Sequence, residues 1–140
     1  MGMLRILIAD DHEVARRGIR ALLESHPGWE VCGEVADGRE AVACAGRLKP
    51  DLVLLDIGIP SLNRLDATRQ ILAAAPETRV LILTMHDAGP LLVKMRDVGV
   101  QGYLLKSDAP KGLPLAINSL LRDQPFFGVS GSEQFRPEKT

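Results

Sequence analysis

Short apolar runs and segments of helical period alternate along the chain. The runs rich in strand-forming residues cover residues 4–9, 29–36, 52–55, 79–84 and 102–105. The segments that follow them place hydrophobic residues three and four positions apart, which is the spacing of a helix that buries one side. Strands and helices that alternate five times predict an α/β domain built on a parallel sheet.

The polarity of these runs predicts their order in the sheet. The runs at 4–9, 52–55 and 79–84 are apolar on both faces, as strands covered by helices on both sides must be. The run at 29–36 contains Glu30 and Glu34, which a regular strand places on one face, so we expect it at an edge. Right-handed crossovers then give the order 2-1-3-4-5, a flavodoxin-like doubly wound sheet of five strands with five helices.

Two helix starts can be read from local signals. Asp37 and Glu40 have the spacing of a capping box, so we expect the second helix to begin between them. Pro114 follows Leu113, the first of the apolar positions that predict the fifth helix. We expect it in the first turn of that helix, where a missing N–H does no harm.

Composition narrows the classes of function. The 140 residues include 17 basic and 18 acidic side chains, a balance that disfavours general electrostatic binding of nucleic acid. The apolar runs are too short for a transmembrane helix, so we expect no membrane partner. Cys32 and Cys44 lie in apolar surroundings without metal-ligand spacing, which favours a reducing, cytoplasmic location.

Polar side chains stand at the carboxyl ends of four predicted strands. The first strand is followed by Asp10 and Asp11, the third by Asp56 and the fifth by Lys106, while the fourth ends in Thr84. Carboxylates this close hold protons unless a cation lies between them, and Mg²⁺ suits oxygen ligands. Lys106 has no acceptor atom for a metal, so we expect it to bind an anion. A metal site, an anion-binding lysine and a nucleophilic carboxylate predict phosphoryl transfer to an aspartate.

Each of these residues also has an ordinary structural interpretation. Asp11 could cap the first helix, Thr84 could lie in a turn and Lys106 could be a solvated charge. We interpret His12 as a solvated residue at the helix start rather than a metal ligand or phosphate carrier. The coincidence of polar groups at four strand ends favours a common site over these separate explanations.

Four segments of the chain resemble the motifs of response-regulator receiver domains, and the resemblance covers residues 3–122. The segments are Ile8-Ala9-Asp10-Asp11-His12, Leu54-Leu55-Asp56-Ile57-Gly58-Ile59-Pro60, Leu83-Thr84-Met85 and Gly102-Tyr103-Leu104-Leu105-Lys106. The last segment and the residues after Thr84 are similar to receivers that precede LuxR-type helix-turn-helix domains.

The resemblance implies an acceptor and a metal site. Asp56 is expected to accept a phosphoryl group from a sensor histidine kinase. Asp11, Asp56 and the carbonyl of Gly58 are expected to bind Mg²⁺, with Asp10 acting largely through water. The implied protein is a signalling switch that assists its own phosphorylation and dephosphorylation, and not an enzyme with a separate substrate.

The resemblance also implies how the switch works. Thr84 and Lys106 are expected to hold the phosphoryl oxygens, and Tyr103 to change its burial as Thr84 moves. Phosphorylation would then favour a homodimer through the fourth helix, fifth strand and fifth helix, with the first and fifth helices as the alternative face.

Other functions on the same fold remain as alternatives. An aspartyl-phosphate phosphatase usually has Asp-x-Asp after its acceptor strand, whereas this chain has Asp56-Ile57-Gly58. A flavodoxin-type cofactor binder would need a phosphate-binding loop after the first strand, and a nucleotide hydrolase a P-loop. A receiver that acts as an interaction module without phosphorylation is the last alternative, which the complete set of polar residues disfavours.

The chain divides into two parts by this interpretation. We expect residues 1–122 to form the receiver and residues 123–140 to be a tail or the start of a linker. The linker would lead to an output domain absent from this chain, and DNA would be bound only through that domain. The expected readout is control of transcription.

Overall fold

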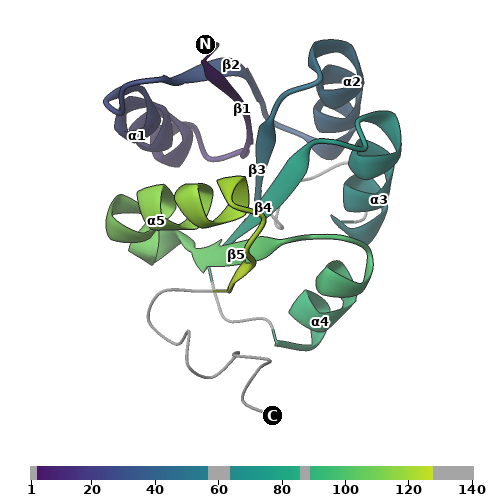
Figure 1. Cartoon of the computed structure of the whole chain (residues 1–140). Coiled ribbons are helices and arrows are strands. Elements are labelled where there is room, and N and C mark those ends of the chain that lie inside the picture. Colours follow the sequence, from purple (N-terminus) through teal and green to yellow (C-terminus); the bar gives the residue numbers. More distant parts are fainter. Residues whose placement is uncertain (1–2, 57–63, 86–88, 128–140) are drawn as a thin grey trace.

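The computed structural model describes residues 3–56, 64–85 and 89–127, which form a parallel sheet between two layers of helices (Figure 1). The strands are β1 (Leu4–Ala9), β2 (Trp29–Val35), β3 (Leu52–Asp56), β4 (Arg79–Thr84), β5 (Gly102–Leu105) and β6 (Phe126–Phe127). They lie in the order β2-β1-β3-β4-β5-β6. The predicted α/β class and the order of the first five strands are confirmed. The sixth strand was not predicted, because two residues are too few to show a period.

Helices cover both faces of the sheet. They are α1 (Glu13–Glu24), α2 (Gly38–Leu48), α3 (Arg64–Ala74), α4 (Gly89–Asp97) and α5 (Ala109–Leu121), with a 3-10 turn at Lys106–Asp108. In Figure 1, α1 and α5 lie on one side of the sheet and α2, α3 and α4 on the other. None of the described helices has the length and apolar composition that crossing a bilayer requires.

Two apolar clusters fill the spaces between the sheet and the helices. Strand side chains alternate between the faces, so Ile6 and Ile8 of β1 join the cluster under α1 and α5. Leu7 and Ala9 of the same strand join the cluster under α2, α3 and α4. All four are fully buried, which fixes the position of the residues that follow β1.

A β-bulge in β2 places its two glutamates on opposite faces of the sheet. Cys32 is an extra residue without a partner on β1, because the register shifts by one at this point. Glu30, before the bulge, lies opposite Arg5, and Glu34, after it, lies opposite Ile8. The prediction that both glutamates share a face is therefore wrong, although β2 is the edge strand as expected.

The start of α2 agrees with the predicted cap. The side chain of Asp37 accepts a hydrogen bond from the backbone N–H of Glu40 at 2.8 Å. The Glu40 carboxylate accepts from the N–H of Ala36 at 3.4 Å rather than from that of Asp37. The helix begins where predicted, with half of the reciprocal capping pair.

The start of α5 differs from the prediction. The helix begins at Ala109, so Pro110 occupies its first turn and Pro114 lies inside it. The helix begins early because the 3-10 turn at Lys106–Asp108 leads directly into it and Ala109 is buried against the sheet. Pro114 therefore leaves one carbonyl of the preceding turn without its usual helical donor.

β6 lies beside β5 because Gly102 leaves room for it. Gly102 pairs with Phe126, and a Cβ atom on Gly102 would lie 2.6 Å from the Phe126 carbonyl oxygen. The turn before β6 contains Asp123 in the left-handed conformation, with φ 60°, and Asp123 forms an ion pair with Arg79 at 2.7 Å. The first residues after α5 thus pack on the sheet.

We expect Gly102→Ala to displace β6, because the added methyl group meets backbone. Overpacking of this kind costs about 1–3 kcal/mol of unfolding free energy. The measurement is hydrogen exchange of the Phe126 amide, which donates to the Gln101 carbonyl at 3.0 Å and should exchange faster in the variant.

Gly18→Ala is the matched control for this substitution. Gly18 lies inside α1, and a Cβ atom there would meet nothing within 4 Å apart from its chain neighbours and the backbone of its own helix. Alanine at this position should leave the Phe126 amide protected and favour the helix. Unchanged protection of that amide in Gly102→Ala would contradict the close approach.

Candidate functional site

The strand-end residues converge at one edge of the sheet, as predicted. β1, β3, β4 and β5 are parallel neighbours, so their carboxyl ends meet. Asp10 directly follows β1, Asp56 and Thr84 end β3 and β4, and Lys106 opens the 3-10 turn after β5. Asp10, Asp56 and Thr84 are buried. The ordinary explanation of Thr84 as a turn residue is excluded, because it belongs to β4.

Lys106 balances two buried carboxylates. Its Nζ lies 2.9 Å from Oδ2 of Asp10 and 3.0 Å from Oδ2 of Asp56. The side chains of Asp10, Asp56 and Lys106 are 0%, 4% and 9% exposed. Charges this well shielded from water interact strongly, so Lys106 is not a solvated surface charge.

The pKa of Asp10 lies below its ordinary value. Burial alone would raise the pKa, but the Lys106 ammonium and the backbone N–H of His12 outweigh it. That N–H donates to Oδ1 of Asp10 at 2.9 Å. Burial would likewise lower the pKa of Lys106, and its bonds to Asp10 and Asp56 raise it instead. Both groups are therefore charged at neutral pH.

His12 lies nearer to the carboxylates than the sequence indicated. Its Nδ1 is 3.3 Å from Oδ1 of Asp10, 3.4 Å from Oδ1 of Asp11 and 3.7 Å from Oδ2 of Asp56. His12 is 60% exposed and occupies the N-cap position of α1 without a side-chain cap bond. Its interpretation as a merely solvated residue is incomplete, and Asp11 is not the helix cap. The sequence feature that could have predicted this is the position of His12 directly after Asp10 and Asp11.

The carboxylate cluster has the composition of a divalent-cation site. Asp10, Asp11, His12 and Asp56 each offer one ligand atom, and these atoms lie within 4.8 Å of one another. Three carboxylates supply the oxygen ligands that Mg²⁺ prefers. Lys106 offsets only part of their charge, so the residues fit a bound dication. Gly58, the fourth predicted ligand, lies outside the described residues.

Thr84 and Tyr103 lie on the same face of neighbouring strands. Tyr103 of β5 pairs with Ile82 of β4, two residues before Thr84. Tyr103 is buried in the cluster under α2, α3 and α4, and its ring centroid lies 6.1 Å from that of Phe127 in β6. The contact with β6 could not be read from the sequence, because it joins residues through the unpredicted strand.

Comparison with known proteins identifies close relatives. The family model of the response regulator receiver domain matches residues 6–118. The response regulator UvrY of Escherichia coli K12 is 36% identical over 143 residues, which is 99% of this chain and 66% of UvrY. The chain thus spans about two thirds of the length of this curated relative.

Solved structures agree with this match. A two-component response regulator of the LuxR family from Aurantimonas superposes with a TM-score of 0.88 at 33% identity, covering 99% of this chain and 98% of that one. The isolated receiver domain of RcsB from Salmonella enterica, solved with the phosphomimetic BeF3−, has a TM-score of 0.84 at 25% identity. That likeness covers 95% of this chain and 98% of the RcsB domain.

We expect Lys106→Ala to reverse the effect of pH on stability in metal-free protein. In the unsubstituted protein the lowered pKa of Asp10 adds stability above the ordinary carboxyl pKa of about 4, and this stability is lost as pH falls through the lowered value. Without the ammonium, burial raises the pKa of Asp10, so the variant should gain stability as pH falls from neutral. At neutral pH its unfolding free energy should drop by about 3 kcal/mol.

Urea unfolding in a chelator at several pH values measures this effect. Lys111→Ala removes an exposed lysine of α5 and is the control for loss of a positive charge. A Lys106→Ala protein with the pH dependence of the unsubstituted chain would contradict the role of Lys106 as counter-charge to Asp10.

Proposed function

This chain belongs to the response-regulator receiver family, and on that premise we propose that its Asp56 accepts a phosphoryl group from a sensor histidine kinase. The observation that carries the proposal is the position of Asp56. It is buried at the end of β3, and its Oδ2 lies 3.0 Å from the ammonium of Lys106. Asp10 and Asp11 supply carboxylates within 4.8 Å, so a charged, partly closed site surrounds the acceptor.

The proposed transfer exchanges one bond to phosphorus for another. A carboxylate oxygen of Asp56 attacks phosphorus, and the bond to the imidazole nitrogen of the donor breaks, with the electron pair staying on nitrogen. Lys106 offsets the charge of the phosphoryl oxygens, and the Thr84 hydroxyl is a further donor to them. The chain positions charge around its own aspartate, so it acts in signalling rather than on a separate substrate.

We propose Mg²⁺ as the cofactor of this transfer. When bound, the ion offsets negative charge on the phosphoryl oxygens. Asp11, Asp56 and the carbonyl of Gly58 would hold it, with Asp10 acting largely through water. Support comes from the surplus of carboxylates over the single ammonium of Lys106.

Residues on one face of β4, β5 and β6 lie between the proposed acceptor site and the end of the described chain. Thr84 lies diagonally across the sheet from Tyr103, whose ring neighbours Phe127. The guanidinium of Arg96 in α4 lies over the Phe127 ring, 4.9 Å from its centroid. A shift of Thr84 toward a phosphoryl group would therefore move Tyr103, and with it α4 and β6.

The output of the switch lies in altered protein contacts. We propose a homodimer through α4, β5 and α5, with α1 and α5 as the alternative face. Residues 1–122 would form the receiver. Residues 123–140, whose strand β6 packs on the receiver's sheet, would lead to an output domain outside this chain that binds DNA and controls transcription. The match covers 66% of UvrY, so that relative extends beyond the part similar to this chain, which supports an output domain outside it. A cytoplasmic location stays a prediction.

We expect acetyl phosphate and Mg²⁺ to add one phosphoryl group to the chain, because the donor only has to reach a preformed acceptor. Intact-mass measurement detects the addition, and Asp56→Ala should abolish it. Lys106→Ala should fold but label slowly. A folded, Mg²⁺-binding chain that gains no mass would instead support an interaction module that works without phosphorylation. Steady release of phosphate from a phosphate monoester, faster than the phosphorylated chain loses its own phosphoryl group, would indicate the phosphatase alternative.

We expect Mg²⁺ affinity to depend on Asp11 and to weaken as pH falls, because protons compete with the metal for carboxylates. Isothermal titration measures the affinity. Asp66→Ala removes an exposed aspartate of α3 and serves as the control for net charge. Equal Mg²⁺ affinity in Asp11→Ala and the unsubstituted chain would remove Asp11 from the site.

A further inference from the structure

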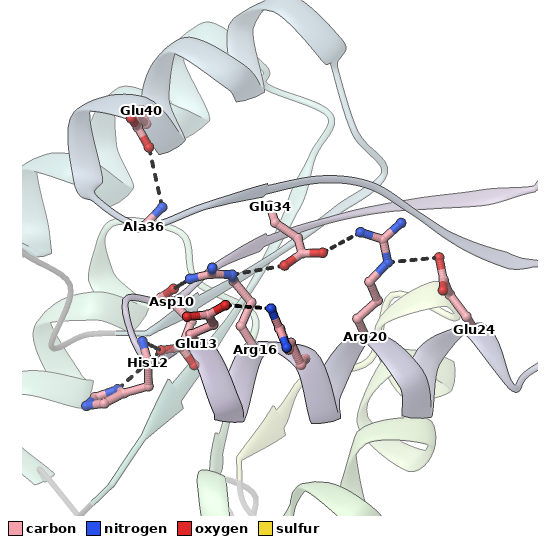
Figure 2. A network of polar contacts seen from close by, with 10 residues as sticks. Asp10, His12, Glu13, Arg16, Arg20, Glu24, Glu34, Ala36 and Glu40 are labelled. Atoms are coloured by element: carbon pink, nitrogen blue, oxygen red, sulfur yellow. Dashed lines mark hydrogen bonds and ion pairs between the residues drawn. The ribbon is translucent and has the colours of Figure 1, made fainter.

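Both main-chain polar groups of Asp10 are tied to the edge strand β2. The N–H of Asp10 donates to the carbonyl of Val35 at 3.0 Å. The carbonyl of Asp10 accepts from Nη1 of Arg16 at 2.6 Å, and Nε of the same guanidinium donates to Oε1 of Glu34 at 2.9 Å. Figure 2 shows the guanidinium between the end of β1 and Glu34. The planar guanidinium of Arg16 thus connects the backbone at Asp10 with β2.

The carbonyl that Arg16 binds belongs to the peptide that joins Asp10 to Asp11. A peptide is planar, so holding its oxygen restricts the direction in which the Asp11 side chain leaves the backbone. The Asp10 carboxylate is held independently by Lys106 and by the N–H of His12. The Asp11 side chain is 36% exposed, and its described ion-pair contact is with the exposed ring of His12. Asp11 therefore depends most on the backbone for its position.

Glu34 keeps the Arg16 guanidinium at this carbonyl. Its side chain is 21% exposed and lies between Arg16 and Arg20, with which it forms ion pairs (Figure 2). Burial would raise the pKa of Glu34, but the bonds from Arg20 and Arg16 lower it, so it is an anion at neutral pH. Without this anion, the carboxylates of the site would attract the Arg16 guanidinium and compete for it.

We propose that Arg16 is a positioning residue for the divalent-cation site, with Glu34 as its anchor on β2. Arg16 acts through the peptide between Asp10 and Asp11 and not by contact with the metal or the phosphoryl group. The inference rests on the proposed function, since it concerns the alignment of Asp11 as a metal ligand.

Arg16→Ala and Arg20→Ala form a matched pair for the test. Both remove one positive charge from α1 and one partner of Glu34, but the described bonds of Arg20 go to Glu24 and Glu34 and not to Asp10. Loss of a residue that supports a metal ligand weakens metal affinity by about tenfold or more. Isothermal titration with Mg²⁺ should show that loss for Arg16→Ala, with the affinity of Arg20→Ala unchanged.

Two further measurements separate positioning from a merely structural role. In metal-free protein, hydrogen exchange of the His12 amide should quicken in Arg16→Ala and not in Arg20→Ala. Labelling by acetyl phosphate in saturating Mg²⁺ should return to the unsubstituted rate in Arg16→Ala, because the defect lies in metal binding. Arg16→Lys keeps the positive charge but loses the planar guanidinium that donates to both Asp10 and Glu34. Its Mg²⁺ affinity should therefore lie between those of the unsubstituted chain and Arg16→Ala.

The outcomes distinguish this inference from the proposed function. Equal losses of Mg²⁺ affinity in Arg16→Ala and Arg20→Ala would overturn the positioning role. The same holds if both Arg16→Ala and Arg16→Lys bind Mg²⁺ with the affinity of the unsubstituted chain. If Arg16→Ala does not fold, Arg16→Lys takes its place in the Mg²⁺ titration and in the hydrogen exchange of the His12 amide. An unsubstituted chain that neither binds Mg²⁺ nor labels would overturn the proposed function, and amide exchange would still decide whether Arg16 holds the turn.

Discussion

The ion pairs of Lys106 with Asp10 and Asp56 are the interaction on which the rest of the site depends. Two buried carboxylates carry a large desolvation cost, and a single ammonium at 2.9 and 3.0 Å makes their burial possible. The sheet must therefore bring the ends of β1, β3 and β5 together, and it does so because these strands are near neighbours in the order of the sheet. The folded state therefore depends on the charges of the site as well as on the apolar core.

The ion pairs of Lys106 leave the site with a net negative charge. One ammonium faces the carboxylates of Asp10, Asp11 and Asp56, so a dication or a change in the charge on Asp56 alters the balance directly. Thr84 lies at the end of the strand between Asp56 and Lys106, and the buried ring of Tyr103 lies on the same face as Thr84. The contacts of Phe127 with Tyr103 and Arg96 extend this packing to β6 and α4. Residues on this face of the sheet thus lie between the end of β4 and the last described strand.

The edge strand β2 contributes more than a boundary to the sheet. Its bulge at Cys32 turns Glu34 toward α1, where Arg16 and Arg20 lie. In a regular strand Glu34 would share the face of Glu30, on the side of α2, and Arg16 would lack this partner. One additional residue in an edge strand therefore supplies the anchor that connects β2 with the backbone of the acid pair.

The sequence alone determined the class of fold, the order of five strands and the residues at their carboxyl ends. These features follow from periods of two and about four residues and from the rule that parallel strands share one carboxyl edge, both of which are local or topological. The structure decided the features that depend on neighbours distant in sequence. The register of β2 against β1 produces the bulge, the contact of Gly102 with Phe126 produces β6, and the turn after β5 sets the start of α5 ahead of Pro114. The place of His12 among the carboxylates and the bond of Arg16 to the Asp10 carbonyl are likewise tertiary, because each requires the positions of at least two elements at once.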